Sequence, residues 1–136
     1  MDVRRRATCL GQYRGLKREV AQLDRRLAEL EAAGDGAACA AMRARLRASR
    51  EGRLAQLERL QGYIDGIGDS LVRQVMVGRY IDGLTWRQVA GSIGERDEQY
   101  PRRLHNRFLA RHELPEWAAS AGEEGNAGDG RAGKGR

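Results

Sequence analysis

Aromatic residues and prolines are scarce in this chain of 136 residues. It contains two Trp, four Tyr, one Phe and two Pro. Enzymes with deep substrate pockets usually line them with more aromatic side chains, so this composition counts against that class. Charged residues make up 32% of the chain and hydrophobic residues 40%, a balance that is typical of long, solvent-exposed helices.

Long apolar runs are missing as well. No stretch approaches about eighteen consecutive apolar residues, so the sequence predicts no membrane-spanning helix. The opening segment, MDVRRRATCLG, is basic but carries no apolar run, and it is therefore not expected to be a signal peptide. We expect the protein to stay in the cytoplasm of the cell that makes it.

The sequence has no pattern for catalysis or metal binding. It lacks a glycine-rich phosphate loop, and its two histidines, His105 and His112, lie on one basic segment without a nucleophile beside them. The cysteines, Cys9 and Cys39, have no metal-ligand spacing. If the chain folds back near residues 34–36, they lie roughly 33 Å apart by the helical rise, too far for a disulfide. We therefore expect two buried free thiols, no cofactor, no metal, and a protein that is not an enzyme.

Basic residues outnumber acidic ones. There are 25 Lys and Arg against 19 Asp and Glu, which gives a net charge of +6, and only Lys17 and Lys134 are lysines. The excess can reflect solubility and a GC-rich coding sequence, or it can serve a polyanionic partner, with nucleic acid as the first candidate. The positions of the arginines in the sequence have to decide between these two explanations of the positive charge.

The first sixty residues have the pattern of a helical hairpin. From residue 9 to residue 30, apolar residues recur at alternating steps of four and three, which is a heptad seam. A stop and a turn follow at Gly34-Asp35-Gly36. A second helix is predicted from Ala37 to about Leu60, with a less regular apolar stripe. The seam consists of Cys9, Tyr13, Leu16, Val20, Leu23, Leu27 and Leu30.

The partner of this seam has two possible sources. An antiparallel pairing with the second helix of the same chain is the simplest, because the turn is short. Pairing between chains is the alternative, since two helices leave apolar surface for others. The hairpin is accordingly either a plain structural coiled coil or a device for homo-oligomerisation or partner docking.

A glycine-rich joint separates this arm from a second region. Gly62, Gly66 and Gly68 disfavour a continuous helix and predict a break or hinge. Asp69 is placed to cap the N-terminus of a helix that is expected over residues 70–81.

A short second helix is expected from Thr85 to Ser92. Thr85 and Gln88 fit a capping box, and Ala90 and Gly94 have the spacing of a helix-turn-helix crossing, which needs a small residue and then a left-handed turn. Together with a basic third helix, these features are typical of a DNA-reading head.

The third helix of this head is predicted to start near Pro101, with Gln99 and Tyr100 in the preceding turn. It carries several arginines and no acid, and arginine and asparagine are the side chains that contact phosphate and base edges. Three carboxylates in the turn before it, at residues 95, 97 and 98, would repel phosphate. The candidate DNA-binding residues are Arg87, Gln99, Arg102, Arg103, His105, Asn106, Arg107 and Arg111.

The residues of the head support a family resemblance. IDGIGDSLVRQVMVGRYIDGLTWRQVAGSIG and RRLHNRFL contain Arg79-Tyr80-Ile81, Gly83, Trp86 and Leu104-His105. With the helical hairpin before it, this pattern resembles phage and prophage regulators of the ArpU/RinA-like group, whose heads are similar to the fourth conserved region of bacterial sigma factors. The resemblance covers most of residues 9–112 and is strongest over 64–109. It implies a sequence-specific DNA-binding regulator in a bacterial host cell, with RNA polymerase as a further partner and base-reading residues at the start of the last helix.

Taken together, the sequence predicts an all-α protein with three regions. Residues 1–62 form an antiparallel helical hairpin (a coiled coil), residues 63–113 a three-helix helix-turn-helix head, and residues 114–136 a disordered, glycine-rich tail from which Trp117 can pack back onto the head. The predicted function is a transcriptional regulator that binds double-stranded DNA. The alternatives are a DNA-packaging protein of the terminase small-subunit kind and a coiled-coil interaction protein with little DNA affinity.

Overall fold

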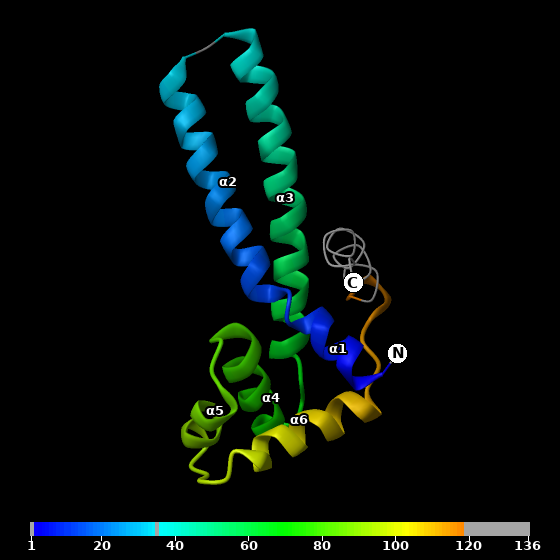
Figure 1. The fold of residues 1–136 in the computed structure, drawn as a ribbon. Coiled ribbons are helices and arrows are strands. Elements are labelled where there is room, and N and C mark those ends of the chain that lie inside the picture. The colour runs from blue at the N-terminus through cyan, green and yellow to red at the C-terminus, as the bar shows by residue number, and fades with distance from the viewer. Residues whose placement is uncertain (1, 35, 119–136) are drawn as a thin grey trace, which may run out of the picture.

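The computed structural model describes residues 2–34 and 36–118, and no strand occurs within them. Two long antiparallel helices form an arm that stands on a compact head (Figure 1). The arm consists of α2 (Tyr13–Ala33) and α3 (Ala37–Asp65). The head contains α4 (Ser70–Met76), its π-helical continuation η1 (Val77–Ile81), α5 (Trp86–Ser92) and α6 (Gln99–Arg111). The predicted all-α hairpin-and-head architecture is confirmed.

The arm is an antiparallel pair within one chain. Helix α2 stops at Gly34, whose φ of +120° suits glycine. Arg43 on α3 reaches back and donates to the Gly34 carbonyl at 3.1 Å, so it binds the end of α2. Ion pairs join acids of α2 to arginines of α3 further along, where the apolar stripe of α3 is interrupted. These pairs are Glu19–Arg53, Asp24–Arg50 and Glu31–Arg47.

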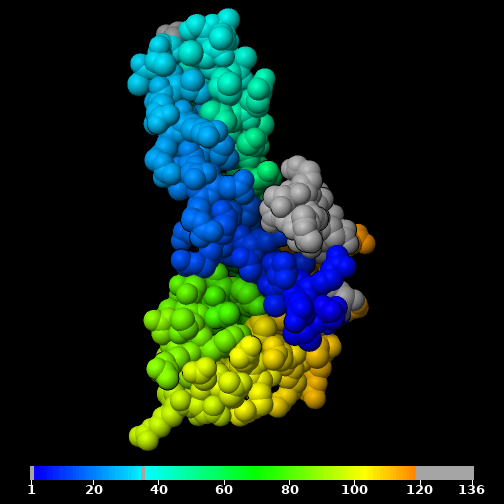
Figure 2. Space-filling model, viewed as in Figure 1, coloured from blue at the N-terminus to red at the C-terminus, as the bar shows by residue number. Residues whose placement is uncertain are grey.

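The predicted seam from residue 9 is not one continuous helix. A separate helix, α1 (Val3–Leu10), ends at Gly11. Helix α1 leaves the arm axis and lies against α6 of the head, between the arm base and α6 (Figure 2). Cys9, on α1, is buried and forms no disulfide, as expected, whereas Cys39 is only half-buried, because it sits near the tip of the two-helix arm. The arm seam therefore begins at Tyr13.

Arm and head share one core at the joint. Helix α3 runs through Gly62 and past the predicted Leu60 to Asp65, so the predicted boundary after residue 62 falls inside a helix. The buried side chains around the joint come from α1, α2, α3, the loop between α3 and α4, α4, η1 and α6. They are Leu10, Tyr13, Leu16, Leu60, Ile64, Ile67, Val72, Met76, Tyr80 and Leu109. Within the head, Val75, Val89 and Ala90 are buried as well.

The first residues of the predicted tail pack onto this core. Leu114 and Trp117 lie against it, and Ala118 is buried. The prediction of disorder from residue 114 is therefore wrong for residues 114–118, because two large apolar side chains there find a surface to cover. Residues 119–136, the rest of the predicted tail, lie outside the described residues. Across the part of the chain that is described, no helix combines the length and apolar character needed to cross a bilayer.

A buried arginine fastens α1 to the head. Arg6 is 7% exposed, and its guanidinium donates through Nη1 to the main-chain carbonyls of Leu109 and His112, the latter at 3.2 Å. Both carbonyls lie at the C-terminus of α6, where helix carbonyls lack intrahelical donors and the helix dipole favours positive charge. Arg6 therefore supplies the C-terminal cap of α6 from a helix more than a hundred residues earlier in the chain.

Replacing Arg6 by Met tests this cap, since the substitution keeps an apolar stem and removes the donors. We expect the free energy of unfolding to fall by about 1–3 kcal/mol, because buried carbonyls lose their hydrogen bonds. Urea unfolding followed by circular dichroism measures it. Arg4→Met on the exposed side of the same helix is the control and should change stability by less than about 0.5 kcal/mol. Equal losses in the two variants would show that Arg6 has no special role.

Candidate nucleic-acid interface

The first head helix is built as the sequence predicts over residues 70–81, with one local difference. The Asp69 carboxylate accepts from the Val72 N–H at 3.0 Å and caps the N-terminus. The last five residues, η1, are π-helical, which was not predicted. Gly78 lies in this wider turn, and a Cβ there would come within 3.4 Å of the Val89 side chain on α5. A Cβ at this distance makes an ordinary van der Waals contact, so η1 and α5 pack together without requiring a glycine here.

The short helix α5 and the turn after it confirm the predicted capping chemistry. Thr85 Oγ1 accepts from the Gln88 N–H at 3.2 Å, and the Gln88 side chain accepts from the Thr85 N–H at 2.9 Å. Ala90 is 1% exposed, as a small residue at a helix crossing should be. Gly94 has a φ of +80°, the left-handed conformation that the turn requires.

The basic helix begins two residues earlier than predicted. Helix α6 starts at Gln99, so Gln99 and Tyr100 belong to the helix and Pro101 is its third residue. Proline is tolerated there because the first N–H groups of a helix have no intrahelical acceptor. The Asp97 carboxylate accepts from the Gln99 N–H at 2.9 Å, so a side chain of the protein already occupies the N-terminus of α6.

His105 does not belong among the DNA-contacting residues. It is 4% exposed and both ring nitrogens have partners inside the protein. Its Nε2 lies 2.6 Å from the Tyr80 hydroxyl, and its Nδ1 lies 2.8 Å from Asn106 Oδ1. A neutral ring satisfies both contacts, with Tyr80 donating to Nε2 and Nδ1–H donating to Asn106. The inclusion of His105 in the predicted site is wrong, because α6 turns this position toward η1 and α5.

The surroundings of His105 hold it neutral. Burial lowers its pKa from the ordinary 6.5, and the nearby Arg79 and Arg102 lower the pKa further, against the opposing hydrogen bond with Asn106. Trp86 packs edge-on against the ring at 5.0 Å between centroids. Burial also raises the pKa of Tyr80 above its ordinary 10.0, so its hydroxyl keeps its proton.

The contact with His105 also orients Asn106. Its Oδ1 accepts from the His105 ring, which leaves the NH₂ group and the second lone pair of the oxygen for other partners. Asn106 is exposed, so its contact with a phosphate or with adenine stays a prediction.

The other predicted residues lie exposed on α5 and around α6. At 100° per residue, Gln99 and Arg103 occupy the side of α6 that faces away from the core. Arg102 lies on the edge of α6 near α1, where it lines a groove with residues of that helix. The opposite edge borders a hollow of about 800 Å³ beside the α3–α4 joint, and two arginines line it: Arg107 and Arg111.

Acidic residues of the turn pair with two of these arginines. Arg103 Nη2 lies 3.6 Å from Asp97 Oδ2, and Arg87 Nε lies 3.8 Å from Glu98 Oε2. All four side chains are largely exposed, so each pair is weak and can open in favour of another anion. Two of the three carboxylates that the sequence placed in conflict with DNA, Asp97 and Glu98, thus pair with neighbouring arginines in the free protein.

Comparison with protein-family models, with curated proteins and with solved structures finds no match to this chain. Within residues 2–34 and 36–118, no group of three His, Cys, Asp or Glu side chains is arranged to hold a metal ion. The case for a function therefore rests on the basic surface around α6.

The buried imidazole makes stability depend on pH with a definite sign. Because the pKa of His105 is lower in the folded protein than the ordinary 6.5, the unfolded chain binds more protons below that pH. Stability should be fully present above about pH 6.5 and fall as the pH drops toward the folded-state pKa. Urea midpoints measured between about pH 7.5 and 5 would show the slope.

His105→Gln should flatten the profile over this range, although it lowers stability at neutral pH. His112→Gln is the matched control, because His112 is exposed at the end of α6, and it should keep the wild-type slope. If His105→Gln kept the same slope as the wild type, another group would be responsible.

Proposed function

We propose that the protein binds double-stranded DNA through α5 and α6, a helix-turn-helix in which α6 enters the major groove. The observation that carries this proposal is the exposed surface of α6, which has arginines on its outward side and on both edges and contains no acid. Recognition helices use this arrangement, with base contacts from the outward side and phosphate contacts from the edges.

The residues divide accordingly into two roles. Gln99 and Arg103 on the outward side are the candidates for reading base edges, Arg103 through a forked contact to guanine. Arg102, Arg107 and Arg111 on the edges are candidates for phosphate contacts, which supply affinity without sequence information. Arg87 at the start of α5 is a further phosphate candidate.

The proposal extends to transcriptional regulation by a phage-type protein, on the resemblance of residues 64–109 to the ArpU/RinA-like group. In that reading RNA polymerase is a second partner, and the arm joins copies of the chain. The last point is supported by the outer part of the arm, where Leu23, Leu27, Leu30 and Leu46 are only half-buried and Met42 is exposed. Sequencing the DNA that the protein captures in its host would identify the regulated genes.

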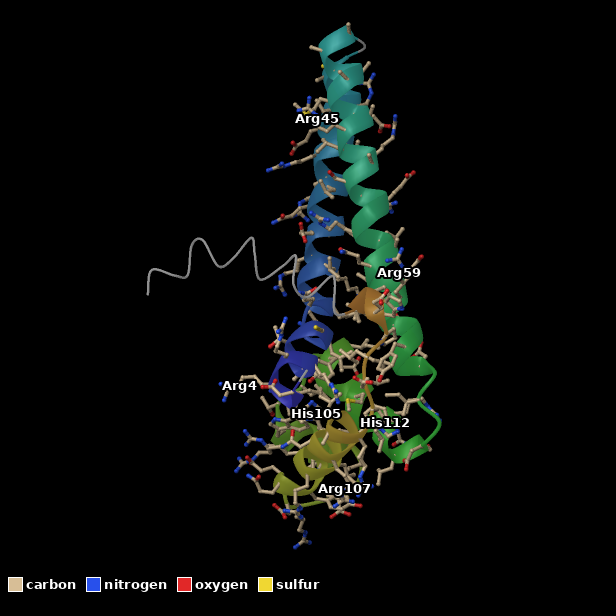
Figure 3. All side chains as sticks on the ribbon, turned by 90° about the vertical axis from the view of Figure 1, so that its right-hand side faces the viewer. Arg4, Arg45, Arg59, His105, Arg107 and His112 are labelled. Atoms are coloured by element: carbon tan, nitrogen blue, oxygen red, sulfur yellow. The ribbon has the colours of Figure 1, made fainter. Side chains whose placement is uncertain are left out.

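Arg103→Ala should weaken binding to a duplex that the wild-type protein selects from a random pool. We expect a loss of about 1–3 kcal/mol, and less discrimination between the selected duplex and a scrambled one, because a base contact is removed. Fluorescence anisotropy at fixed salt measures both. Arg45→Ala, an exposed arginine near the tip of the arm (Figure 3), is the control and should bind as the wild type does. A wild-type protein with no affinity for any duplex would refute the proposal.

Asp97→Asn should strengthen DNA binding severalfold. The amide oxygen of Asn can still accept from the Gln99 N–H, so this hydrogen bond at the start of α6 survives. Arg103 loses its ion-pair partner, and one negative charge leaves the surface that meets phosphate. Asp24→Asn, which breaks a comparable pair in the arm, is the control and should leave the affinity unchanged. Weaker binding by Asp97→Asn would mean that the carboxylate orients Arg103 for DNA.

A further inference from the structure

A second basic element, α1, lies beside α6. It lies against α6 at an angle (Figure 1), and residues of the two helices contact each other. Between α1 and the head is an open groove of about 620 Å³. Its lining includes Arg4 and Thr8 from α1, Arg79 and Trp86 from η1 and α5, and Arg102 with Asn106 from α6.

The charge in this groove is of one sign. Three arginines line it, and no Asp or Glu is among its lining residues. The guanidinium groups of Arg4 and Arg102 have no hydrogen-bond or ion-pair partner within the described part of the chain. Arg4 projects from α1 into solvent (Figure 3). Like charges gathered without a counterion repel one another, so the groove favours an anion that several of them can share.

The remaining arginine of the groove is held in place. Arg79 lies over the Trp86 ring at 4.5 Å and donates to the Leu84 carbonyl at 3.1 Å. Asn106 adds an NH₂ donor, since its contact with His105 is made through the amide oxygen. The groove therefore presents several donors at its α6 edge, which suits the oxygens of a phosphate.

We infer that this groove binds the phosphate backbone of the duplex that α6 reads, so that α1 forms a second wall of the DNA-binding surface with Arg4 as its principal phosphate contact. This inference rests on the proposed function. When the outward side of α6 enters a major groove, the strand beside its Arg102 edge faces α1. Arg6 keeps α1 in that place by binding the C-terminus of α6.

The inference is tested by the salt dependence of binding by the full chain, with duplex DNA as the probe. Arg4→Ala should reduce the slope of log affinity against log salt by about 0.9, the value for one phosphate contact. Affinity for the selected and the scrambled duplex should fall by the same factor, because a phosphate contact carries no sequence information. Arg4→Lys should retain most of the slope, since it keeps the charge. In ethylation interference, Arg4→Ala should lose one phosphate, at the flank of the site, whose ethylation weakens binding of the wild-type protein.

Two controls separate this inference from the proposed function. Arg45→Ala removes an exposed arginine from the arm and should leave the slope unchanged. Arg103→Ala should reduce discrimination, which Arg4→Ala leaves intact. If Arg103→Ala weakens binding while Arg4→Ala changes neither slope nor footprint, the groove does not contact DNA and the proposed function stands. If the wild type binds no duplex, both fail.

Other ligands of the groove give distinct outcomes. Inorganic phosphate, titrated by nuclear magnetic resonance, should shift the groove residues only weakly in the wild type and not in Arg4→Ala. Tight phosphate binding that depends on Arg4, together with DNA binding that does not, would overturn the inference in favour of a small-anion site. Binding of an acidic peptide with the same dependence, again without an effect on DNA, would make the groove a protein contact.

Discussion

The position of α6 depends on one buried contact, between the Arg6 guanidinium and the carbonyls at the C-terminus of α6. A helix end needs donors, and in this fold they come from a helix at the other end of the chain. The contact holds α1 against the head and not along the arm. It thereby also places the apolar side chains of α1, among them Leu10, in the core at the joint. Burying a guanidinium is unfavourable unless it is hydrogen-bonded, so α1 cannot leave α6 without exposing or orphaning both partners.

A second buried polar contact sets the rotation of α6 about its own axis. Tyr80 and His105 meet in the interior, and Trp86 packs against the imidazole. Turning α6 by one residue would move His105 away from Tyr80 by about 100° and bring an arginine to the core. The pair thus keeps the arginines on the surface, which is the condition for any contact with a polyanion. The other ring nitrogen of His105 contacts Asn106 Oδ1, so the residue that orients α6 also orients one of its exposed side chains.

Acidic side chains in the turn before α6 offset part of the positive charge of the neighbouring arginines. In the free protein Asp97 and Glu98 pair with Arg103 and Arg87 at distances of 3.6 and 3.8 Å. Pairs of this kind are weak in water, and a phosphate or a base edge can replace the carboxylate at little cost. The groove beside α1 has no such internal partner, so its positive charge is uncompensated. A duplex would therefore meet one region in which it must displace acids and another in which it meets only donors.

Local rules of sequence determined much of this fold. The end of α2 at Gly34, the caps at Asp69 and Thr85 and the left-handed Gly94 follow from short-range chemistry, and the structure has all of them. Tertiary packing decided what local rules could not. The break after Leu10, the extension of α3 through Gly62 and the π-helical end of the first head helix depend on surfaces that meet only in the folded chain.

The candidate site was likewise only partly predictable. The sequence indicated which arginines α6 carries. Whether His105 faces solvent or Tyr80, and whether Arg4 lies beside Arg102, depends on contacts between residues 25 to about a hundred positions apart. Periodicity shows which side chains share a face of a helix, and only the packed structure shows what that face meets.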